Sequence, residues 1–314
     1  MCYPYSKKLF TRTVDLYREQ YQESLTATCR LFGVSRQVYY RAKRSIVQRK
    51  QTAEKVIKMV EEIRMQQPRI GARKLYYLLT DKLSVLGVGR DRLFAILKAN
   101  HMLIKPKRAY HVTTDSHHRF WKHRNLIEGI TPTRPEQIWV SDITYVGNRD
   151  YPMYLALVTD AYSKKIVGYD LSDSLKSTGV LMALKMAVKH RSYHDQPLIH
   201  HSDRGFQYCC DGYQKALKKN NLQCSMTESY DPYANAVAER VNGIIKQEFL
   251  LEYKLNIESM RQLIKESINT YNKFRPHSSC MMRTPVEMHQ QSSIEIKTYK
   301  MKKSSKLTPA TPYI

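Results

Sequence analysis

Three acidic residues occupy positions in the sequence where a carboxylate needs a specific reason to be present. Asp142 lies inside the β-branched and aromatic run "IWVSDITYVG" (138–147), where an unpaired charge among apolar neighbours is costly. Asp203 follows the short run "LIHH" and a serine, and a glycine comes two residues after it. Glu239 lies in "NAVAERVNGIIKQEFLLEY" (235–253), with 35 residues between it and Asp203. The order and spacing of the three acids predict a shared site.

Three converging carboxylates would suit hard ions that prefer oxygen ligands, Mg²⁺ or Mn²⁺. Two such ions about 3.5–4 Å apart can hold the attacking and leaving oxygens of a phosphodiester. We therefore predict two ions per active site, with Asp142 bridging both and Asp203 and Glu239 each completing one. Asp160, in "LVTDAYS", has a similar setting, but we interpret it as a turn-capping residue.

The segments that carry these acids predict an α/β fold. Short β-branched and aromatic runs favour three antiparallel strands at 138–147, 151–163 and 164–172. The chain then predicts, in order, a helix at 178–191, a strand at 197–203, a helix at 211–220, a strand at 222–228 and a long helix at 235–253. This order is typical of a five-stranded mixed sheet covered by helices.

The first part of the chain predicts helices only. The stretch "SLTATCRLFGVSRQVYYRAKR" (24–44) favours a helix, a tight turn at Gly33 and a second helix with Ser35 at its N-cap. That second helix carries side chains suited to phosphates and base edges, namely Arg36, Gln37 and Arg41. A second helical pair, at 70–82 and 89–103, would expose the basic residues Arg90 and Arg92.

Charge is concentrated in this helical part. The chain of 314 residues has a formal net charge of +24. Residues 1–134 hold 28 Lys and Arg against 10 Asp and Glu, whereas residues 135–314 hold 24 against 18. A basic region of this kind indicates binding to a polyanion, most simply nucleic acid.

The composition excludes several other classes of protein. Hydrophobic residues make up 42% of the chain, which is typical of a globular protein. The apolar runs are too short for a membrane span, and no signal peptide is visible, so we expect a cytoplasmic protein with no membrane partner. The six cysteines include no CxxC pair, which argues against a zinc site and favours reduced thiols.

Four stretches of the sequence resemble the integrase-core motifs of insertion-sequence transposases. They are "IWVSDITYV", "HHSDRGFQY", "YDPYANAVAERVNGIIKQEF" and "YNKFRPHSSCMMRTPVEM". The chain is similar to the insertion-sequence-three family, in the form of its separate second-frame product, from about residue 24 to 288. The resemblance implies a ribonuclease-H-like integrase core, preceded by an all-α helix-turn-helix DNA-binding region. It also implies DNA transposition through a DDE triad and two divalent ions.

The resemblance assigns roles to particular residues. By motif, the triad falls on Asp142, Asp203 and Glu239. Further residues match motif positions expected near the DNA, namely Asn235, Lys246, Arg275 and His277. Lys246 follows Glu239 by seven residues and therefore shares its helical face.

The predicted organisation has five parts. These are a helix-turn-helix region (1–50), a second helical DNA-binding region (51–110), a basic linker (111–134), the catalytic core (135–290) and a basic, disordered tail (291–314). The expected partners are the terminal inverted repeats of the element, target DNA, further copies of the chain assembled on DNA, and an upstream-frame helix-turn-helix protein. Two alternatives fit the same residues: a catalytically silent DNA-binding regulator, and a structure-selective nuclease that cuts without joining.

Overall fold

The computed structural model describes residues 7–104, 121, 123–147, 151–227, 235–250 and 256–290. The predicted tail (291–314) lies outside the described residues, as do positions 111–120 and 122 of the predicted linker.

A five-stranded sheet forms the centre of the core, as the sequence predicts. Its strands are β1 (Ile138–Tyr145), β2 (Tyr154–Asp160), β3 (Ile166–Ser172), β4 (Leu198–Ser202) and β5 (Leu222–Met226). The spatial order is β3-β2-β1-β4-β5. Strands β1, β2 and β3 pair antiparallel, while β4 pairs parallel with both β1 and β5. The sheet is therefore mixed, and β1 lies at the change from antiparallel to parallel pairing.

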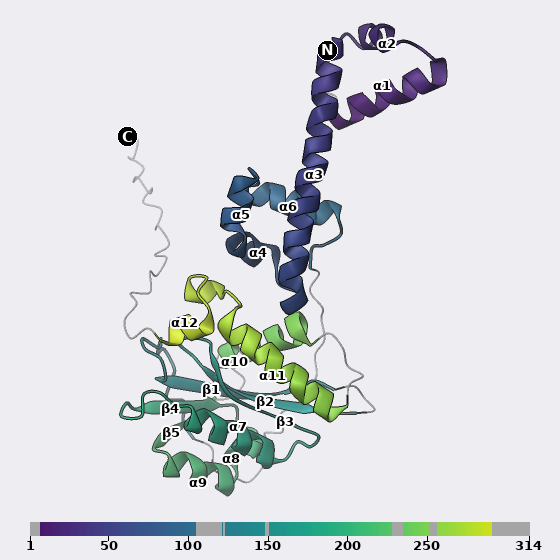
Figure 1. Cartoon of the computed structure of the whole chain (residues 1–314). Coiled ribbons are helices and arrows are strands. Elements are labelled where there is room, and N and C mark those ends of the chain that lie inside the picture. Colours follow the sequence, from purple (N-terminus) through teal and green to yellow (C-terminus); the bar gives the residue numbers. More distant parts are fainter. Residues whose placement is uncertain are drawn as a thin grey trace, which may run out of the picture.

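Helices cover both faces of this sheet (Figure 1). One face packs against α7 (Ser177–Lys189), α8 (Phe206–Cys209) and α9 (Asp211–Lys219). The other face packs against α10 (Ala236–Ile244), the π-helical turn η1 (Ile245–Phe249) and α11 (Ile257–Lys273). A short 3-10 turn, η2 (Ser278–Cys280), and α12 (Pro285–His289) complete the core. The β1 side chains alternate between these two layers, because successive residues of a strand point to opposite faces.

The predicted long helix at 235–253 is interrupted in the structure. Regular α-helix ends at Ile244, and the hydrogen bonding widens to the π type from Ile245 to Phe249. Ile245 and Phe249 are both buried in the cluster between this segment and the sheet. These two residues are four positions apart, a spacing that a regular helix would also bury on one face, so the burial agrees with the sequence pattern while the π-type hydrogen bonding was not predicted.

The helical unit, residues 7–104, stands beside the core as a separate body of helices (Figure 1). Helices α1 (Lys7–Tyr21) and α2 (Leu25–Leu31) pack on the start of α3 (Arg36–Gln66) through a small cluster of Val14, Cys29 and Tyr39. Gly33 has a φ of +67° in the turn between α2 and α3, a conformation that favours glycine. Ser35 holds the N-cap position of α3 as predicted, although its side chain makes no capping hydrogen bond.

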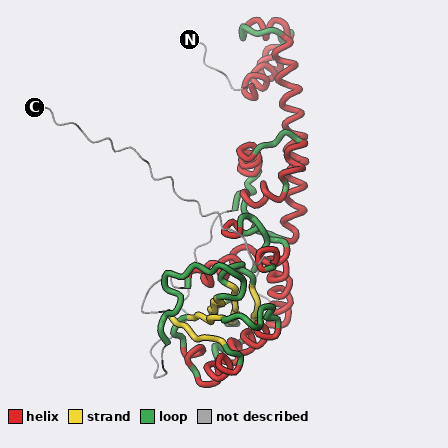
Figure 2. The backbone as a smooth tube through the Cα atoms, turned by 90° about the vertical axis from the view of Figure 1, so that its left-hand side faces the viewer, coloured by secondary structure: helices red, strands yellow, loops and turns green. Residues whose placement is uncertain are grey.

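The second half of α3 belongs to a different cluster. Val56 and Val60 of α3 pack against α4 (Ala72–Leu78), α5 (Thr80–Val85) and α6 (Arg90–Ala99). Between Ala42 and Val56, no side chain of α3 is buried. The predicted boundary after residue 50 falls in this exposed stretch, where the helix continues without a break. Figure 2 shows the resulting elongated molecule, with α3 running along it.

Among the helices in the described ranges, none is both long enough and apolar enough to cross a lipid bilayer.

Candidate active site

Strands β1 and β4 place Asp142 and Asp203 side by side. The parallel register pairs Ser141 of β1 with Ser202 of β4. The residue that follows each serine is one of the two aspartates. One carboxylate oxygen of Asp203, Oδ1, accepts a hydrogen bond of 3.0 Å from the backbone N–H of Gly205. The glycine turn after β4 thus fixes the Asp203 carboxylate beside the end of the strand.

Helix α10 packs on the β1 face that carries Asp142. The Asn242 amide donates a hydrogen bond of 2.7 Å to Asp142 Oδ2, and the Ile143 backbone N–H donates one of 2.9 Å to Oδ1. At the start of the helix, Asn235 Nδ2 donates to the Ser141 carbonyl at 3.2 Å. These bonds orient the Asp142 carboxyl and fasten α10 to the strand. Glu239 lies one turn before Asn242 on the same helix.

The electrostatics of Asp142 report the presence of the other two acids. Burial, together with the negative charge of Asp203, raises the pKa of Asp142 to about 7. The hydrogen bonds from Asn242 and the Ile143 N–H oppose this shift, while Glu239 adds to it. Asp203 and Glu239 therefore both act on the Asp142 carboxyl, although they come from distant parts of the sequence.

Lys246 faces the same carboxyl from the π-turn. Burial lowers the pKa of Lys246, and the Asp142 charge opposes that shift. The Lys246 side chain is half-buried, so it is less exposed than we expect for a side chain that only contacts a DNA phosphate at the surface.

A group of carboxylates has the right donor chemistry for Mg²⁺ or Mn²⁺. Within the described ranges, however, no three His, Cys, Asp or Glu side chains already stand together as a ligand group for a metal ion.

The polar end of β4 is explained by a hydrogen-bond network on the opposite face of the sheet. The His200 Nε2 atom lies 2.8 Å from Ser141 Oγ and 2.9 Å from the Tyr213 hydroxyl. Burial lowers the pKa of His200 to about 3, so the ring is neutral at physiological pH. His200 therefore joins β1, β4 and α9 beneath the two aspartates.

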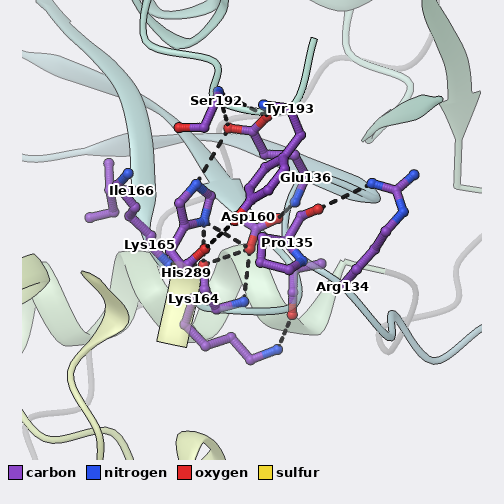
Figure 3. A network of polar contacts seen from close by, with 12 residues as sticks. Arg134, Pro135, Glu136, Asp160, Lys164, Lys165, Ile166, Ser192, Tyr193 and His289 are labelled. Carbon is purple, nitrogen blue, oxygen red and sulfur yellow. Dashed lines mark hydrogen bonds and ion pairs between the residues drawn. The ribbon is translucent and has the colours of Figure 1, made fainter. Parts of the chain in front are cut away.

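Asp160 caps a turn, as predicted, and does not belong to the acidic site. Its Oδ2 atom accepts from the Ser163 backbone N–H at 2.8 Å and from the Ser163 hydroxyl at 2.5 Å. Its Oδ1 atom accepts from the backbone N–H of Glu136 at 2.8 Å. His289 of α12 lies between Asp160 and Glu136, with ring nitrogens 3.5 and 3.3 Å from their oxygens (Figure 3). The network fastens α12 to the start of β1 and the end of β2.

The predicted DNA-contacting residues of the helical unit are all exposed. Arg36, Gln37 and Arg41 lie on the first turns of α3, and Arg90 and Arg92 lie on the first turn of α6. Their exposure leaves these side chains accessible to a nucleic acid.

The three remaining predicted contacts lie in the interior instead. Arg275 is 1% exposed, because its guanidinium makes two hydrogen bonds of 2.7 Å to the Glu248 carboxylate. His277 is 7% exposed, and burial lowers its pKa to about 3. Asn235 is 8% exposed and holds the Ser141 carbonyl. All three side chains are buried and make their contacts within the core, and their contact with DNA stays a prediction.

Two residues with a part in this site were missed from the sequence. Asn242 could have been found, because it follows Glu239 by three residues and so shares its helical face. Glu248 gave no signal, because its partner Arg275 lies 27 residues further along the chain.

A polar groove of about 400 Å³ runs beside α10 and is lined by Ala236, Glu239, Arg240, Gly243, Ile244, Gln247 and Glu248.

Comparison with known proteins gives consistent matches. Two family models, each described as "Integrase core domain", match residues 132–232 and 220–285. The chain is 36% identical over 257 residues to the "Insertion element IS600 uncharacterized 31 kDa protein" of Shigella sonnei, covering 80% of this chain and 93% of that protein. It is 30% identical over 276 residues to "Transposase InsF for insertion sequence IS3A" of Escherichia coli (strain K12), covering 85% of this chain and 94% of that protein.

Solved structures resemble the chain more distantly. The catalytic core domain of HTLV-2 integrase, in complex with magnesium (trimeric form), aligns with a TM-score of 0.41 and 21% identity, covering 53% of this chain and 99% of that one. A chain of the simian T-cell lymphotropic virus intasome aligns with a TM-score of 0.45 and 18% identity, covering 77% of this chain and 79% of that one. The integrase-core match and the mixed sheet confirm the predicted fold class, a ribonuclease-H-like core preceded by an all-α region.

Proposed function

The chain belongs to the insertion-sequence-three family of transposases, and on this premise we propose that Asp142, Asp203 and Glu239 form its DDE triad. The enzyme is a polynucleotidyl transferase, and we propose that it cleaves the ends of an insertion element and joins them to target DNA. The observation that carries the assignment is the Asp142 carboxyl, whose pKa is raised to about 7 by burial, by Asp203 and, to a smaller degree, by Glu239. Structural acids such as Asp160 have their charge satisfied by hydrogen bonds instead.

The proposed cofactor is Mg²⁺ or Mn²⁺, two ions per active site, held by the three carboxylates. Unrelieved negative charge around Asp142 supports this proposal, because a divalent cation would remove the repulsion that raises its pKa. When bound, the ions would activate the attacking oxygen and stabilise the leaving one. Magnesium accompanies the HTLV-2 integrase core, which the chain resembles distantly.

The protein's own side chains supply orientation and charge around the reaction. Asn242 and the Ile143 N–H hold both oxygens of Asp142, so the carboxylate has a fixed direction. Lys246 places a positive charge beside the same site, where a phosphate of the DNA end would lie. No side chain needs to form a covalent bond to DNA: water attacks in cleavage, and the freed 3′-hydroxyl attacks in strand transfer.

DNA binding would begin at the helical unit. Its exposed basic residues, and the excess of positive charge in residues 1–134, support contact with the phosphates of the terminal inverted repeats. Assembly of several copies on DNA is part of the proposal. A partner protein from an upstream frame stays a prediction from the family resemblance.

Strand-joining assays on the purified chain test the proposal. The wild-type protein would be incubated with pre-cut element-end duplexes, a target plasmid and Mg²⁺ or Mn²⁺. We expect joined products, and we expect Asp203→Asn and Glu239→Gln to lose cleavage and joining together while retaining end binding. Glu258→Gln is a matched control, because Glu258 is an exposed acid at the start of α11.

Other outcomes would point to other functions. Cleavage without joining would indicate a structure-selective nuclease, and binding without chemistry would indicate a DNA-binding regulator. Efficient joining by Glu239→Gln would show that the triad is assigned to the wrong residues.

A further inference from the structure

The helical unit is seated on the core close to the helix that carries Glu239. The Arg69 backbone N–H donates to the Glu248 carbonyl at 3.3 Å, and Gln67 Nε2 donates to the Phe274 carbonyl at 3.4 Å. The ammonium group of Lys74, on α4, lies 3.8 Å from Glu248 Oε1. Glu248 thus takes part in two of these three contacts, once through its backbone and once through its side chain.

The Glu248 side chain also neutralises a buried cation of the core. Its two carboxylate oxygens accept the two 2.7 Å hydrogen bonds from Arg275. One carboxylate therefore serves Arg275 from within the core and Lys74 from the helical unit. Burial lowers the pKa of Lys74, the Arg275 charge lowers it further, and Glu248 opposes both effects. Without Glu248, two cations would face each other with little solvent between them.

The position of Glu248 links this junction to the acidic site. It lies in the π-turn η1, which continues α10 directly and also contains Lys246. Glu239, Asn242 and Lys246 precede it on the same continuous segment. Any shift of the π-turn would move the Lys246 side chain relative to Asp142, with which it interacts electrostatically. Single π-turns inside helices are often found at functional sites.

We propose that Glu248 is a positioning residue that couples the seating of the helical unit to the geometry of the catalytic helix. The proposal rests on the proposed function, because α10 is catalytic only if Glu239 belongs to the triad. With the helical unit seated, the contacts from Arg69 and Lys74 hold Glu248 and keep η1 in its wide turn. With the unit displaced, Glu248 keeps only its partner in the core, and Lys246 in the π-turn loses its fixed placement beside the acidic site. Chemistry would then depend on how the DNA-bound helical unit sits on the core.

The test compares Lys74→Met with Arg73→Met in the full-length chain. Both substitutions remove one positive charge from α4. Arg73, however, is exposed and is only the sequence neighbour of Lys74, the residue that contacts Glu248. Neither variant removes the Glu248–Arg275 pair, so both should fold. Two measurements are made: amide hydrogen exchange of residues 235–250 without DNA, and the single-turnover rate of strand joining at saturating DNA and Mn²⁺.

We expect amide exchange in the π-turn to be about fivefold faster in Lys74→Met than in Arg73→Met, because one constraint on η1 is lost. We expect the joining rate of Lys74→Met to fall about tenfold, with the two variants binding end DNA equally well. Lys74→Arg should restore both measurements. Combining Lys74→Met with Glu248→Gln should slow joining by less than the product of the two separate effects, because both changes break one contact.

Two results distinguish this proposal from the proposed function. Equal exchange rates in Lys74→Met and Arg73→Met would overturn the coupling role, whatever the activity. A wild-type chain that joins no DNA while Lys74→Met still loosens the π-turn would leave the coupling intact and overturn the function instead.

Discussion

At the scale of single residues, two aspartates of the core have opposite surroundings. Asp160 receives hydrogen bonds from two backbone N–H groups and a hydroxyl, so its carboxylate is well satisfied. Asp142 receives two hydrogen bonds but also faces the negative charges of Asp203 and Glu239. One acid stabilises the fold, and the other is held in place at a cost to stability.

We expect Asp142→Asn to raise the melting temperature of the metal-free protein at pH 8. The folded-state pKa of Asp142 is raised to about 7, so between about pH 4 and pH 7 the folded state holds a proton that the unfolded state has lost. Wild-type stability therefore falls as the pH rises from about 4 to about 7 and stays low above that range. Removing the charge should raise the melting temperature by about 2–4 °C at pH 8 for each kcal/mol gained. At pH 4 the gain should vanish.

Asp160→Asn is the matched substitution, and it should lower the melting temperature at both pH values. Loss of one partner in a buried hydrogen-bond network costs about 1–3 kcal/mol. Calorimetry of the three proteins in chelator at pH 4 and pH 8 makes the comparison. If both variants are equally destabilised at pH 8, the charge on Asp142 is not unfavourable in the folded protein.

At the scale of elements, the sequence predicts what depends on local periodicity. Alternation along 138–147 places Asp142 on the face with Val140, and the structure confirms this, since that face meets α10. Seven-residue spacing places Lys246 near the site of Glu239, and its interaction with Asp142 agrees. The mixed sheet also agrees with the predicted succession of strands and helices, whereas its spatial strand order was not predicted.

Other features depend on distant partners and could not be predicted in this way. A basic residue in a motif has the same sequence signature whether it contacts DNA or a carboxylate of the protein itself, and Arg275 contacts Glu248. The π-turn likewise departs from the regular helix that the sequence predicts, and it packs in one cluster with residues of the sheet and α11 that lie far from it in the sequence. The sequence also gave no indication that a single helix, α3, would join both parts of the helical unit.

Close packing of α7 on β3 leads to a prediction about two glycines. A Cβ atom at Gly168 would lie 2.1 Å from the Ala183 carbonyl oxygen and 2.8 Å from the Ala187 backbone nitrogen. Because both atoms belong to the backbone, Gly168→Ala must push α7 off the sheet, at a cost of at least about 1–3 kcal/mol. A Cβ atom at Gly243, in α10, meets nothing within 4 Å. Gly243→Ala should stabilise the protein by up to about 1 kcal/mol, because alanine favours helix.

Urea unfolding of the two glycine variants measures this difference directly. Equal midpoints for Gly168→Ala and the wild type would show that α7 does not need its close approach to β3.

At the scale of the whole molecule, charge and chemistry are divided between the two bodies. The exposed residues Arg36 and Arg41 lie at one end of α3, while the acids of the site lie in the core at the other end. We therefore expect most of the salt dependence of DNA binding to come from the helical unit. Each phosphate contact contributes a slope of about 0.9 in log K against log salt concentration for duplex DNA.

The double variant Arg36→Ala/Arg41→Ala should reduce this slope by about 1.8, if each arginine holds one phosphate. The double variant Lys185→Ala/Lys189→Ala removes the same charge from exposed positions of α7. Because α7 packs on the face of the sheet opposite α10, this variant should leave the slope unchanged. Fluorescence anisotropy with end duplexes over a range of salt concentrations measures both. Equal slopes for the two double variants would assign the phosphate contacts elsewhere.

The uninterrupted helix α3 has a consequence for the DNA that such an enzyme can use. Its 31 residues span about 46 Å at 1.5 Å per residue, the length of about 14 base pairs of duplex. If the start of α3 binds DNA as we propose, a rigid helix of that length would set the distance between the recognised sequence and the site of cleavage. It also sets a phase, because one added residue would turn the reading head by about 100° around the helix axis. The number of residues in α3 would therefore determine the spacing between the recognition sequence and the cleavage point.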